Sequence, residues 1–217
     1  MKRKKYLFIT VIIAALLVVT PAWANLIQNG SFENGTDPNS GPNKYITLYS
    51  LNNTDITGWT VNGGTGSSID YIGSYWVASE GNRSIDMAGL SNGSISQSFG
   101  TNIGATYLVK FFMAGNPDGE PTIKKLNVTA GGTSQDYTFN TAGYTRGSMG
   151  WTDKEFTFQA TGITTTLTFS NAYSGSDPFY GVALDDVRVG VVPIPPTVLL
   201  LGAGLIGLVG VRRRFKK

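Results

Sequence analysis

Short stretches in which apolar and polar residues alternate run through the middle of the chain. Ser94–Phe99, Lys125–Ala130 and Ile163–Phe169 each follow this pattern. Alternation with a period of two is typical of a strand that buries one face. No helical period of similar length occurs between residues 25 and 190, so the pattern predicts an all-β sandwich.

Further segments extend this prediction. Tyr107–Met113 is a more continuous apolar run, which favours a central strand covered on both faces. The pattern of Val182–Val189 predicts the last strand. Residues 34–43 and 71–83 lack a strand pattern and are rich in turn formers. Because loops carry binding residues more often than strands do, we expect the functional site there.

The N-terminal residues 1–24 predict a secretory signal peptide. Lys2–Lys5 is positively charged, Tyr6–Val19 is apolar, and Ala22-Trp23-Ala24 is a small-residue cleavage motif. This interpretation makes the Sec machinery and signal peptidase partners of the chain. An uncleaved N-terminal membrane helix is the alternative.

The C-terminal residues 191–217 predict a membrane anchor. A proline-rich linker leads to an apolar run over residues 198–211, and a basic cluster over residues 212–217 follows. As a helix the run would span about 21 Å at ~1.5 Å per residue, and the arginine stems bring it closer to the ~30 Å hydrocarbon core. The basic cluster is expected to stay cytoplasmic, so residues 25–190 would lie outside.

This tail resembles the PEP-CTERM sorting signal of Gram-negative bacteria. The matching residues are Val192, Pro193, Pro195, Pro196, Arg212, Arg213 and Arg214. Ile194 stands where that signal has its glutamate. The resemblance implies processing by an exosortase-like enzyme and a place at the cell envelope or surface, either anchored in the membrane or released to the extracellular matrix. An anchor that is never cut is the alternative.

Charge and composition exclude several classes of function. The chain has a formal charge of +3, but nine of its 17 Lys and Arg lie at the two ends. Eight remain between the ends against all 14 Asp and Glu, which gives the middle a charge of about −6. A basic nucleic-acid surface is therefore not expected. The chain has no Cys and no His, which excludes disulfides, thiol nucleophiles, histidine triads and His-ligated zinc.

An ordered series of motifs carries a second resemblance. In chain order these are Asn25–Glu33, Gly58-Trp59, Ile69–Trp76, Gly81–Asp86, Ile95–Phe99, Ala114–Pro117, Trp151 and Ala183–Val187. Together they are similar to the choice-of-anchor C family of bacterial surface proteins, and to plant cell-wall proteins built from galactose-binding-like jelly rolls. The resemblance covers nearly all of residues 25–190. It implies a jelly-roll β-sandwich and an association with extracellular or cell-wall polysaccharide.

The same resemblance implies a structural calcium site where the first and last strands meet. Its candidate ligands are Glu33 and one of Asp185 and Asp186, with backbone carbonyls near Asn29. Calcium takes about six to eight oxygen ligands, and carboxylates from both ends of the domain would join them. Alternation directs the two aspartates to opposite faces unless a bulge intervenes. The alternative is that Glu33 caps a turn and the aspartates are exposed.

Aromatic and polar residues gather in and beside the second long loop. The candidates for contact with a sugar are Tyr71, Tyr75, Trp76, Asn82, Arg83 and Asp86. Aromatic rings stack on the C–H faces of sugars, and the polar groups bond the hydroxyls. Tyr144, Arg146, Tyr173 and Tyr180 can approach from other loops. The alternative for each ring is core packing, which we expect for Trp59 and Trp151.

Three functions stay open at this stage. The leading one is an exported, surface-anchored protein without enzymatic activity that associates with polysaccharide. The second is a structural or self-associating matrix protein that has no glycan site. The third is a glycosidase, which would need two carboxylates about 5–9 Å apart across a cleft. No pairing in the sequence indicates such a centre, and Asn116–Pro121 is expected to be a solvated turn.

Overall fold

The computed structural model describes residues 24–173 and 179–193. The predicted signal peptide, the membrane helix over residues 198–211 and the arginines of the sorting motif fall outside these ranges. Within them, no helix is long and apolar enough to cross a membrane. The helical element of this part of the chain is a single 3-10 turn, η1 (Pro38–Ser40), whose first residues are capped by the Asp37 carboxylate.

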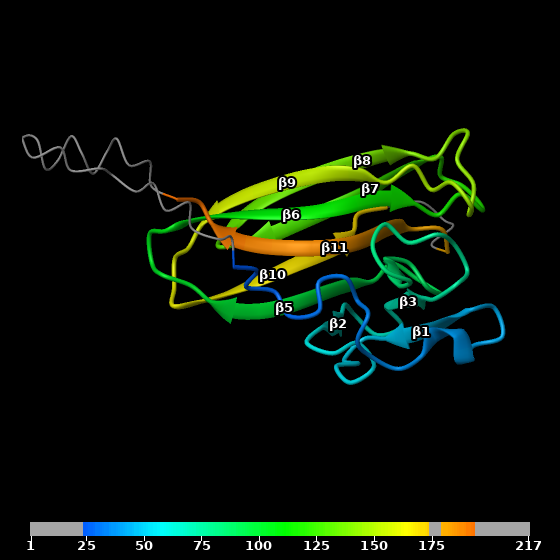
Figure 1. Ribbon diagram of the computed structural model, residues 1–217, viewed down its shortest axis with the longest axis horizontal. Coiled ribbons are helices and arrows are strands. Elements are labelled where there is room, and N and C mark those ends of the chain that lie inside the picture. The colour runs from blue at the N-terminus through cyan, green and yellow to red at the C-terminus, as the bar shows by residue number, and fades with distance from the viewer. Residues whose placement is uncertain (1–23, 174–178, 194–217) are drawn as a thin grey trace, which may run out of the picture.

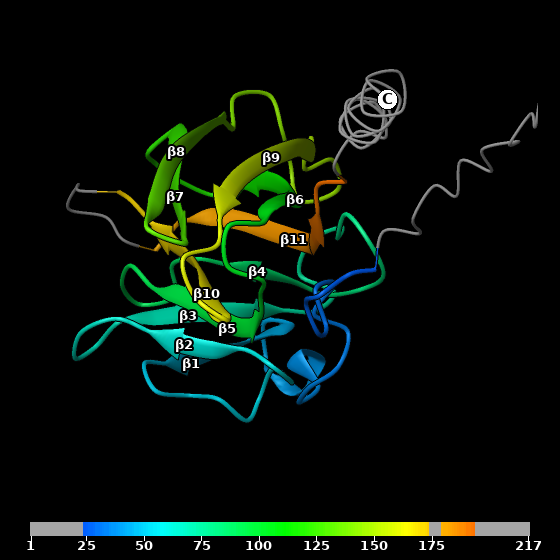
Figure 2. The ribbon, with the colours of Figure 1, turned by 90° about the vertical axis from the view of Figure 1, so that its left-hand side faces the viewer.

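Eleven strands form two antiparallel sheets in the described residues. The first sheet contains, in spatial order, β1 (Tyr45–Tyr49), β3 (Ser68–Ile72), β4 (Ser84–Asp86), β11 (Val182–Val191), β6 (Thr106–Gly115) and β9 (Thr152–Gln159). The second contains β2 (Thr60–Asn62), β5 (Ser94–Gly100), β10 (Thr164–Asn171), β7 (Ile123–Ala130) and β8 (Thr133–Asn140). The two sheets pack face to face (Figure 1 and Figure 2). The predicted all-β sandwich is confirmed.

The core lies between the sheets and follows from the alternation in each strand. In β5 and β10 every second residue is buried, and in β6 the inward residues are Tyr107, Val109, Phe111 and Met113. Phe111 meets Phe169 of the opposite sheet edge to face, with ring centroids 5.2 Å apart. Burial of each such side chain contributes about 1.5–3 kcal/mol. The period-two pattern thus encodes which face each strand presents to the core.

Two strands differ from what their sequences indicate. β6 is central, between β11 and β9, as expected. Its outward residues Leu108, Lys110 and Phe112 are only half-buried, so the expectation that it is covered on both faces was wrong in part. β8 has one buried side chain, Phe139. An edge strand with so little to bury shows alternation only over Tyr137–Phe139.

The outer face of the six-stranded sheet carries the features that concern function. Thr47, Asp70 and Asp86 are successive partners across β1, β3 and β4, and Ala183 of β11 continues the row. Residues 73–83, the 73–83 loop, join β3 to β4 and lie over this face. Trp76 donates its indole N–H to Ser84 Oγ on β4, at 2.7 Å. The loop therefore occupies part of the sheet surface instead of projecting into solvent.

Candidate functional site

Two carboxylates from opposite ends of the domain hold the 73–83 loop. Glu33 Oε1 accepts hydrogen bonds from the backbone N–H groups of Asn82 and Arg83, at 2.7 and 2.8 Å. Asp185 Oδ2 accepts from the backbone N–H groups of Ser79 and Glu80, at 2.8 and 2.9 Å. Hydrogen bonds to an ionised acceptor are stronger than neutral ones. The second half of the loop is therefore fixed at two successive points.

A β-bulge explains how Asp185 reaches the loop. The register of β11 against β6 shifts between Asp185 and Arg188, and Asp186 has a φ of 46°. A bulge breaks the alternation of side chains. Asp185 is fully buried, while Asp186 pairs with Arg188 at 2.8 Å. Burial raises the pKa of Asp185 to about 7, and the backbone N–H groups that it accepts from oppose this rise.

The three carboxylates proposed as calcium ligands do not share a site in this arrangement. Glu33 and Asp185 bond to different parts of the loop, and both oxygens of Asp186 face Arg188. Among residues 24–173 and 179–193, no three Asp, Glu, Cys or His side chains gather closely enough to hold a metal ion. The geometry does not fit an ion shared by these side chains. Calcium binding itself stays a prediction.

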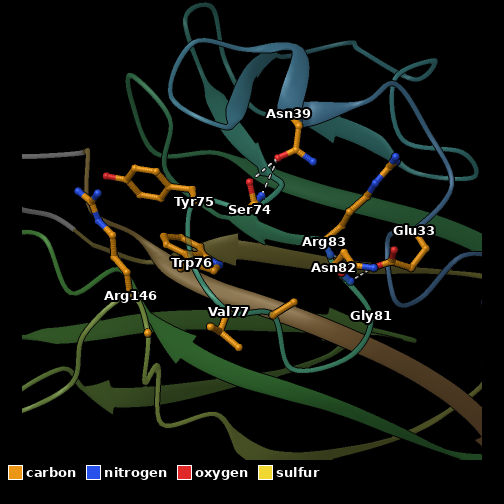
Figure 3. A pocket seen from close by; sticks show the side chains of 12 residues that line it. Glu33, Asn39, Ser74, Tyr75, Trp76, Val77, Gly81, Asn82, Arg83 and Arg146 are labelled. Atoms are coloured by element: carbon orange, nitrogen blue, oxygen red, sulfur yellow. Dashed lines mark hydrogen bonds between the residues drawn. The ribbon is translucent and has the colours of Figure 1, made fainter.

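A groove of about 720 Å³ runs beside the 73–83 loop. It is lined by Glu33, Asn39, Ser74, Tyr75, Trp76, Val77, Ala78, Gly81, Asn82, Arg83, Arg146 and Gly147. Figure 3 shows Tyr75 and Arg146 at one end, Glu33, Asn82 and Arg83 at the other, and Trp76 and Val77 between them. The groove thus combines aromatic and apolar surface along its length with polar and charged groups at both ends.

Tyr75 and Arg146 form one ordered end of the groove. The Arg146 guanidinium stacks on the Tyr75 ring, 4.0 Å from its centroid. Arg146 Nε donates to both oxygens of Asp118, at 2.8 and 3.0 Å, and the Tyr75 hydroxyl donates to Asp118 Oδ2 at 2.7 Å. Burial, and then the bond to Asp118, raise the pKa of Tyr75 above its ordinary value. The tyrosine stays a neutral hydrogen-bond donor at physiological pH.

The other end and the floor are fixed by bonds within the protein. Arg83 Nη1 donates to Gly35 O at 3.2 Å and to the Tyr71 hydroxyl at 2.7 Å. Asn39 Oδ1 accepts from the backbone N–H and the hydroxyl of Ser74, both at 2.8 Å. Trp76 is 4% exposed, so it offers the groove only part of its ring. These bonds preorganise the groove, which lowers the ordering cost of binding.

Four of the six predicted sugar-contact residues line the groove, namely Tyr75, Trp76, Asn82 and Arg83. The other two do not. Tyr71 is fully buried on the core face of β3, and its hydroxyl donates to Phe32 O. Asp86 is 1% exposed and lines a different pocket. Both lie within strands, where alternation and not sequence proximity to Tyr75 decides the direction of a side chain.

Of the residues expected to approach from other loops, Arg146 joins the groove. Tyr180 lines the second pocket, and Tyr144 packs on Phe139 with ring centroids 5.4 Å apart. Trp59 is in the core, as expected. Trp151 is half-buried and packs against the core while its indole N–H donates to Val77 O at 3.0 Å, so its assignment to the core is confirmed in part.

A second, smaller pocket of about 270 Å³ lies on the other side of Tyr75. It is lined by Tyr45, Thr47, Asp70, Ile72, Tyr75, Asp86, Gly89, Leu90, Asn116, Phe179 and Tyr180. Burial raises the pKa of Asp70 to about 6, opposed by a hydrogen bond from Thr47. Burial also raises the pKa of Asp86 well above its ordinary value, and the neighbouring charge of Asp70 adds to this rise.

No single stretch of the sequence indicates this second pocket. Its residues come from β1, β3, β4, the 73–83 loop and three later loops, and no stretch of sequence contains more than a few of them. The available signal was the alternation in Tyr45–Tyr49, which places Tyr45 and Thr47 on one face of a strand. That Thr47 and Asp70 are neighbours depends on strand register, which the sequence does not show.

Comparisons with known proteins place this domain among relatives. The model of a family described as "Protein of unknown function (DUF642)" matches residues 25–190. Halomucin of Haloquadratum walsbyi is 34% identical over 166 residues, which are 76% of this chain and 2% of that protein. The chain therefore spans only a small part of this curated relative.

Solved structures with a similar arrangement of strands include carbohydrate-binding modules. TmCBM61 in complex with β-1,4-galactotriose is 18% identical, with a TM-score of 0.49, and the match covers 78% of this chain and 99% of that one. The CBM22-1 xylan-binding domain of Paenibacillus barcinonensis Xyn10C is 15% identical, with a TM-score of 0.48, over 80% of this chain and 97% of that one.

Proposed function

We propose, for a chain that belongs to the DUF642 family of proteins of unknown function, that it binds polysaccharide in the groove beside the 73–83 loop and does not act on it as an enzyme. The observation that carries this proposal is the groove itself. It joins the rings of Tyr75 and Trp76 with the side chains of Asn82, Arg83 and Arg146 in one hollow.

The chemistry of the groove suits a sugar polymer. A volume of about 720 Å³ lies within the ~300–1,000 Å³ range of ligand sites. Tyr75 is half-buried with Arg146 over its ring and Trp76 is 4% exposed, so the exposed parts of the rings can contact sugar C–H groups while the amide and guanidinium donors bond sugar hydroxyls. The groove is also supported by hydrogen bonds that already exist without a ligand, so little rearrangement is needed on binding.

A binding role is favoured over catalysis by what the nearest carboxylates do. Glu33 accepts two backbone hydrogen bonds that hold the loop. Asp118 accepts from Arg146 and from Tyr75. A glycosidase needs two carboxyl groups that are free to exchange protons or attack the substrate across the cleft. The carboxylates around this groove instead maintain its shape.

The two ends of the chain support a place outside the cell. The pattern of residues 1–24 favours export, and the pattern of residues 191–217 favours anchoring at the envelope or surface, with or without processing. Many anchored copies can retain a polymer even when each site binds weakly, since avidity multiplies weak affinities. We therefore propose retention of extracellular or cell-wall polysaccharide as the role of the protein.

A steric block of the groove tests this function. Gly147 lines the groove, has no unusual φ, and an added Cβ would meet only Thr145 Oγ1, at 4.0 Å. The variant Gly147→Trp should therefore fold normally while it fills the groove. The matched control is Gly100→Trp on β5, where an added Cβ meets nothing within 4 Å.

The assay is retention of the full-length protein on cellulose, chitin, chitosan, xylan, galactan and the matrix of the producing organism. We expect wild type and Gly100→Trp to be retained equally on at least one of these, and Gly147→Trp to lose at least about tenfold in retention. Equal retention of both variants would overturn the groove as the site. Absence of retention on the whole panel would reject the binding function and favour a structural matrix protein.

A further inference from the structure

The second pocket differs from the groove in having an acidic floor between aromatic walls. Asp70 and Asp86 are direct partners across β3 and β4, so their carboxyl groups lie side by side. Tyr45 and Tyr75 form one wall, in edge-to-face contact with ring centroids 5.2 Å apart. Tyr180 also lines the pocket. Such a combination suits a ligand that is positively charged and also has apolar surface.

The two carboxylates are not equivalent. Asp86 is 1% exposed, and both of its oxygens accept hydrogen bonds: Oδ1 from the N–H groups of Ala88 and Gly181, each at 3.0 Å, and Oδ2 from Asn116 at 2.8 Å. Asp70 Oδ1 accepts from the Thr47 hydroxyl at 2.6 Å. No described residue donates a hydrogen bond to Asp70 Oδ2. Asp70 is thus the carboxylate that can meet a ligand.

The charge of Asp70 is poorly compensated by its surroundings. Lys124 is buried, and its Nζ donates to Gly119 O at 2.8 Å and lies 5.8 Å from the centre of the Tyr180 ring. Its charge acts on Asp86. Asp70 forms no ion pair with any residue in the described part of the chain. Its raised pKa, about 6, agrees with a half-buried charge that a cation would stabilise.

We propose that this pocket binds the protonated amine of an amino-sugar unit, with Asp70 Oδ2 as acceptor and the Tyr45 and Tyr180 rings against the sugar. The inference rests on the proposed polysaccharide-binding function and names a unit of its ligand. Tyr75 lines both the groove and the pocket. A polymer lying in the groove can therefore place one de-acetylated unit in the pocket.

The free amine is the group that this site distinguishes. An ammonium next to Asp70 forms a charge-assisted hydrogen bond and reduces the repulsion between Asp70 and Asp86. An acetylated nitrogen carries no charge, and its acetyl group adds volume to a pocket of about 270 Å³. A neutral hydroxyl at the same place donates a weaker bond. The pocket should therefore prefer amino sugars over both acetylated and neutral ones.

The test compares a glucosamine trimer, an N-acetylglucosamine trimer and a glucose trimer by calorimetric titration of the full-length protein. We expect the glucosamine trimer to bind at least about tenfold more tightly than the other two. Asp70→Asn should remove this preference and leave the acetylated and neutral trimers unchanged. The matched control is Asp153→Asn, an exposed aspartate on β9 of the same sheet, which should change nothing.

A second variant tests the inference independently in case Asp70→Asn does not fold. Leu90 is 55% exposed and lines the pocket, so Leu90→Lys would place a tethered ammonium near Asp70 with little cost to folding. It should compete with the glucosamine trimer and weaken its binding. Thermal unfolding of each variant establishes that the fold is intact.

Several outcomes would overturn the inference. Equal binding of the three trimers by wild type, or a preference that survives in folded Asp70→Asn, rules out an amine site at Asp70. Equally tight binding of lysine amide would assign the pocket to protein amines instead of sugars. Gly147→Trp separates the two proposals, since it should block polymer retention while the trimer preference remains. A change of retention in Gly147→Trp without any amine preference would support the groove alone.

Discussion

The groove and the acidic pocket adjoin at Tyr75, and one pocket carboxylate, Asp70, accepts fewer hydrogen bonds than Asp86 beside it or the carboxylates around the groove. In the groove, Glu33 accepts two backbone hydrogen bonds and Asp118 is paired with Arg146. In the pocket, Asp70 has a single hydroxyl donor and faces another acid. Glu33 holds the loop and Asp118 holds Arg146 and Tyr75 through these hydrogen bonds. Asp70 is half-buried with little compensation, so it is available for a ligand.

The 73–83 loop is what separates the two hollows. Its first residues, Ser74 to Trp76, cross between them, and its last residues are held by Asp185 and Glu33. The loop therefore has to stay on the sheet for the two sites to exist as distinct sites.

The largest effect is expected when Asp185 is replaced by alanine. The change leaves the backbone N–H groups of Ser79, Glu80 and Asp186 without their acceptor, in a place where the side chain is fully buried. We expect a loss of about 3 kcal/mol or more in the free energy of unfolding, measured with urea. Asp185→Asn should lose less because its amide oxygen can still accept. An alanine variant as stable as wild type would show that the loop does not depend on this acceptor.

The effect of pH on the free energy of unfolding should be similar to that of Asp185→Ala or smaller. The pKa values of Asp70 and Asp185 are raised from 3.8 to about 6 and about 7. Between the ordinary and the raised values the native state holds more protons than the unfolded state, so stability falls as pH rises through this window. For Asp70 the rise in pKa corresponds to about 3 kcal/mol in the free energy of unfolding.

Thermal unfolding at a series of pH values checks this prediction. Tm should be higher at pH 5 than at pH 7.5, and Asp70→Asn should raise Tm at pH 7.5 and flatten the profile. Below about pH 4 the lowered pKa of Asp55, held by hydrogen bonds from Thr36 and Asn52, contributes in the opposite direction. A Tm that increases steadily from pH 5 to pH 7.5 would contradict the assignment of buried, poorly compensated acids to the pocket.

The smallest effect on stability is expected at Arg146, on the groove side. Its side chain is 49% exposed, and an exposed ion pair such as that with Asp118 contributes at most about 1 kcal/mol. Arg146→Gln should thus change Tm little while it weakens polysaccharide retention several-fold, because the guanidinium over the Tyr75 ring is lost. Retention equal to wild type would place the polymer elsewhere in the groove. The amine preference at Asp70 should not change, which keeps the two sites distinguishable.

Much of the fold could be predicted from the sequence because strands that pack on the core show alternating apolar and polar residues. Strands such as β5 and β10 bury every second residue, so their pattern is visible. β8 buries only Phe139, and its alternation is limited to Tyr137–Phe139, which is too short to identify a strand. The bulge at Asp185 depends on how β11 pairs with β6, which is a property of the sheet and not of the segment.

The site could be predicted only as far as it lies within one loop. Tyr75, Trp76, Asn82 and Arg83 are close in sequence and share the groove. Tyr71 could not be separated from them without knowing that it points into the core. The pairing of Asp70 with Asp86 depends on strand register, which the sequence does not show. Arg146 contacts Tyr75 from a loop about 70 residues away, so sequence proximity gave no indication of this contact.

The measurement that tests the central claim most directly is the response of the tryptophan indole N–H resonances to a bound oligosaccharide. Trp76 and Trp59 are 4% and 2% exposed, and of the two Trp76 lines the groove; its N–H is bonded to Ser84 Oγ at 2.7 Å and that of Trp59 to Asn29 O at 3.0 Å. On titration of the full-length protein with a fragment of the retained polysaccharide, the account predicts that the Trp76 resonance shifts and the Trp59 resonance does not. Saturable binding with an unmoved Trp76 resonance would contradict it.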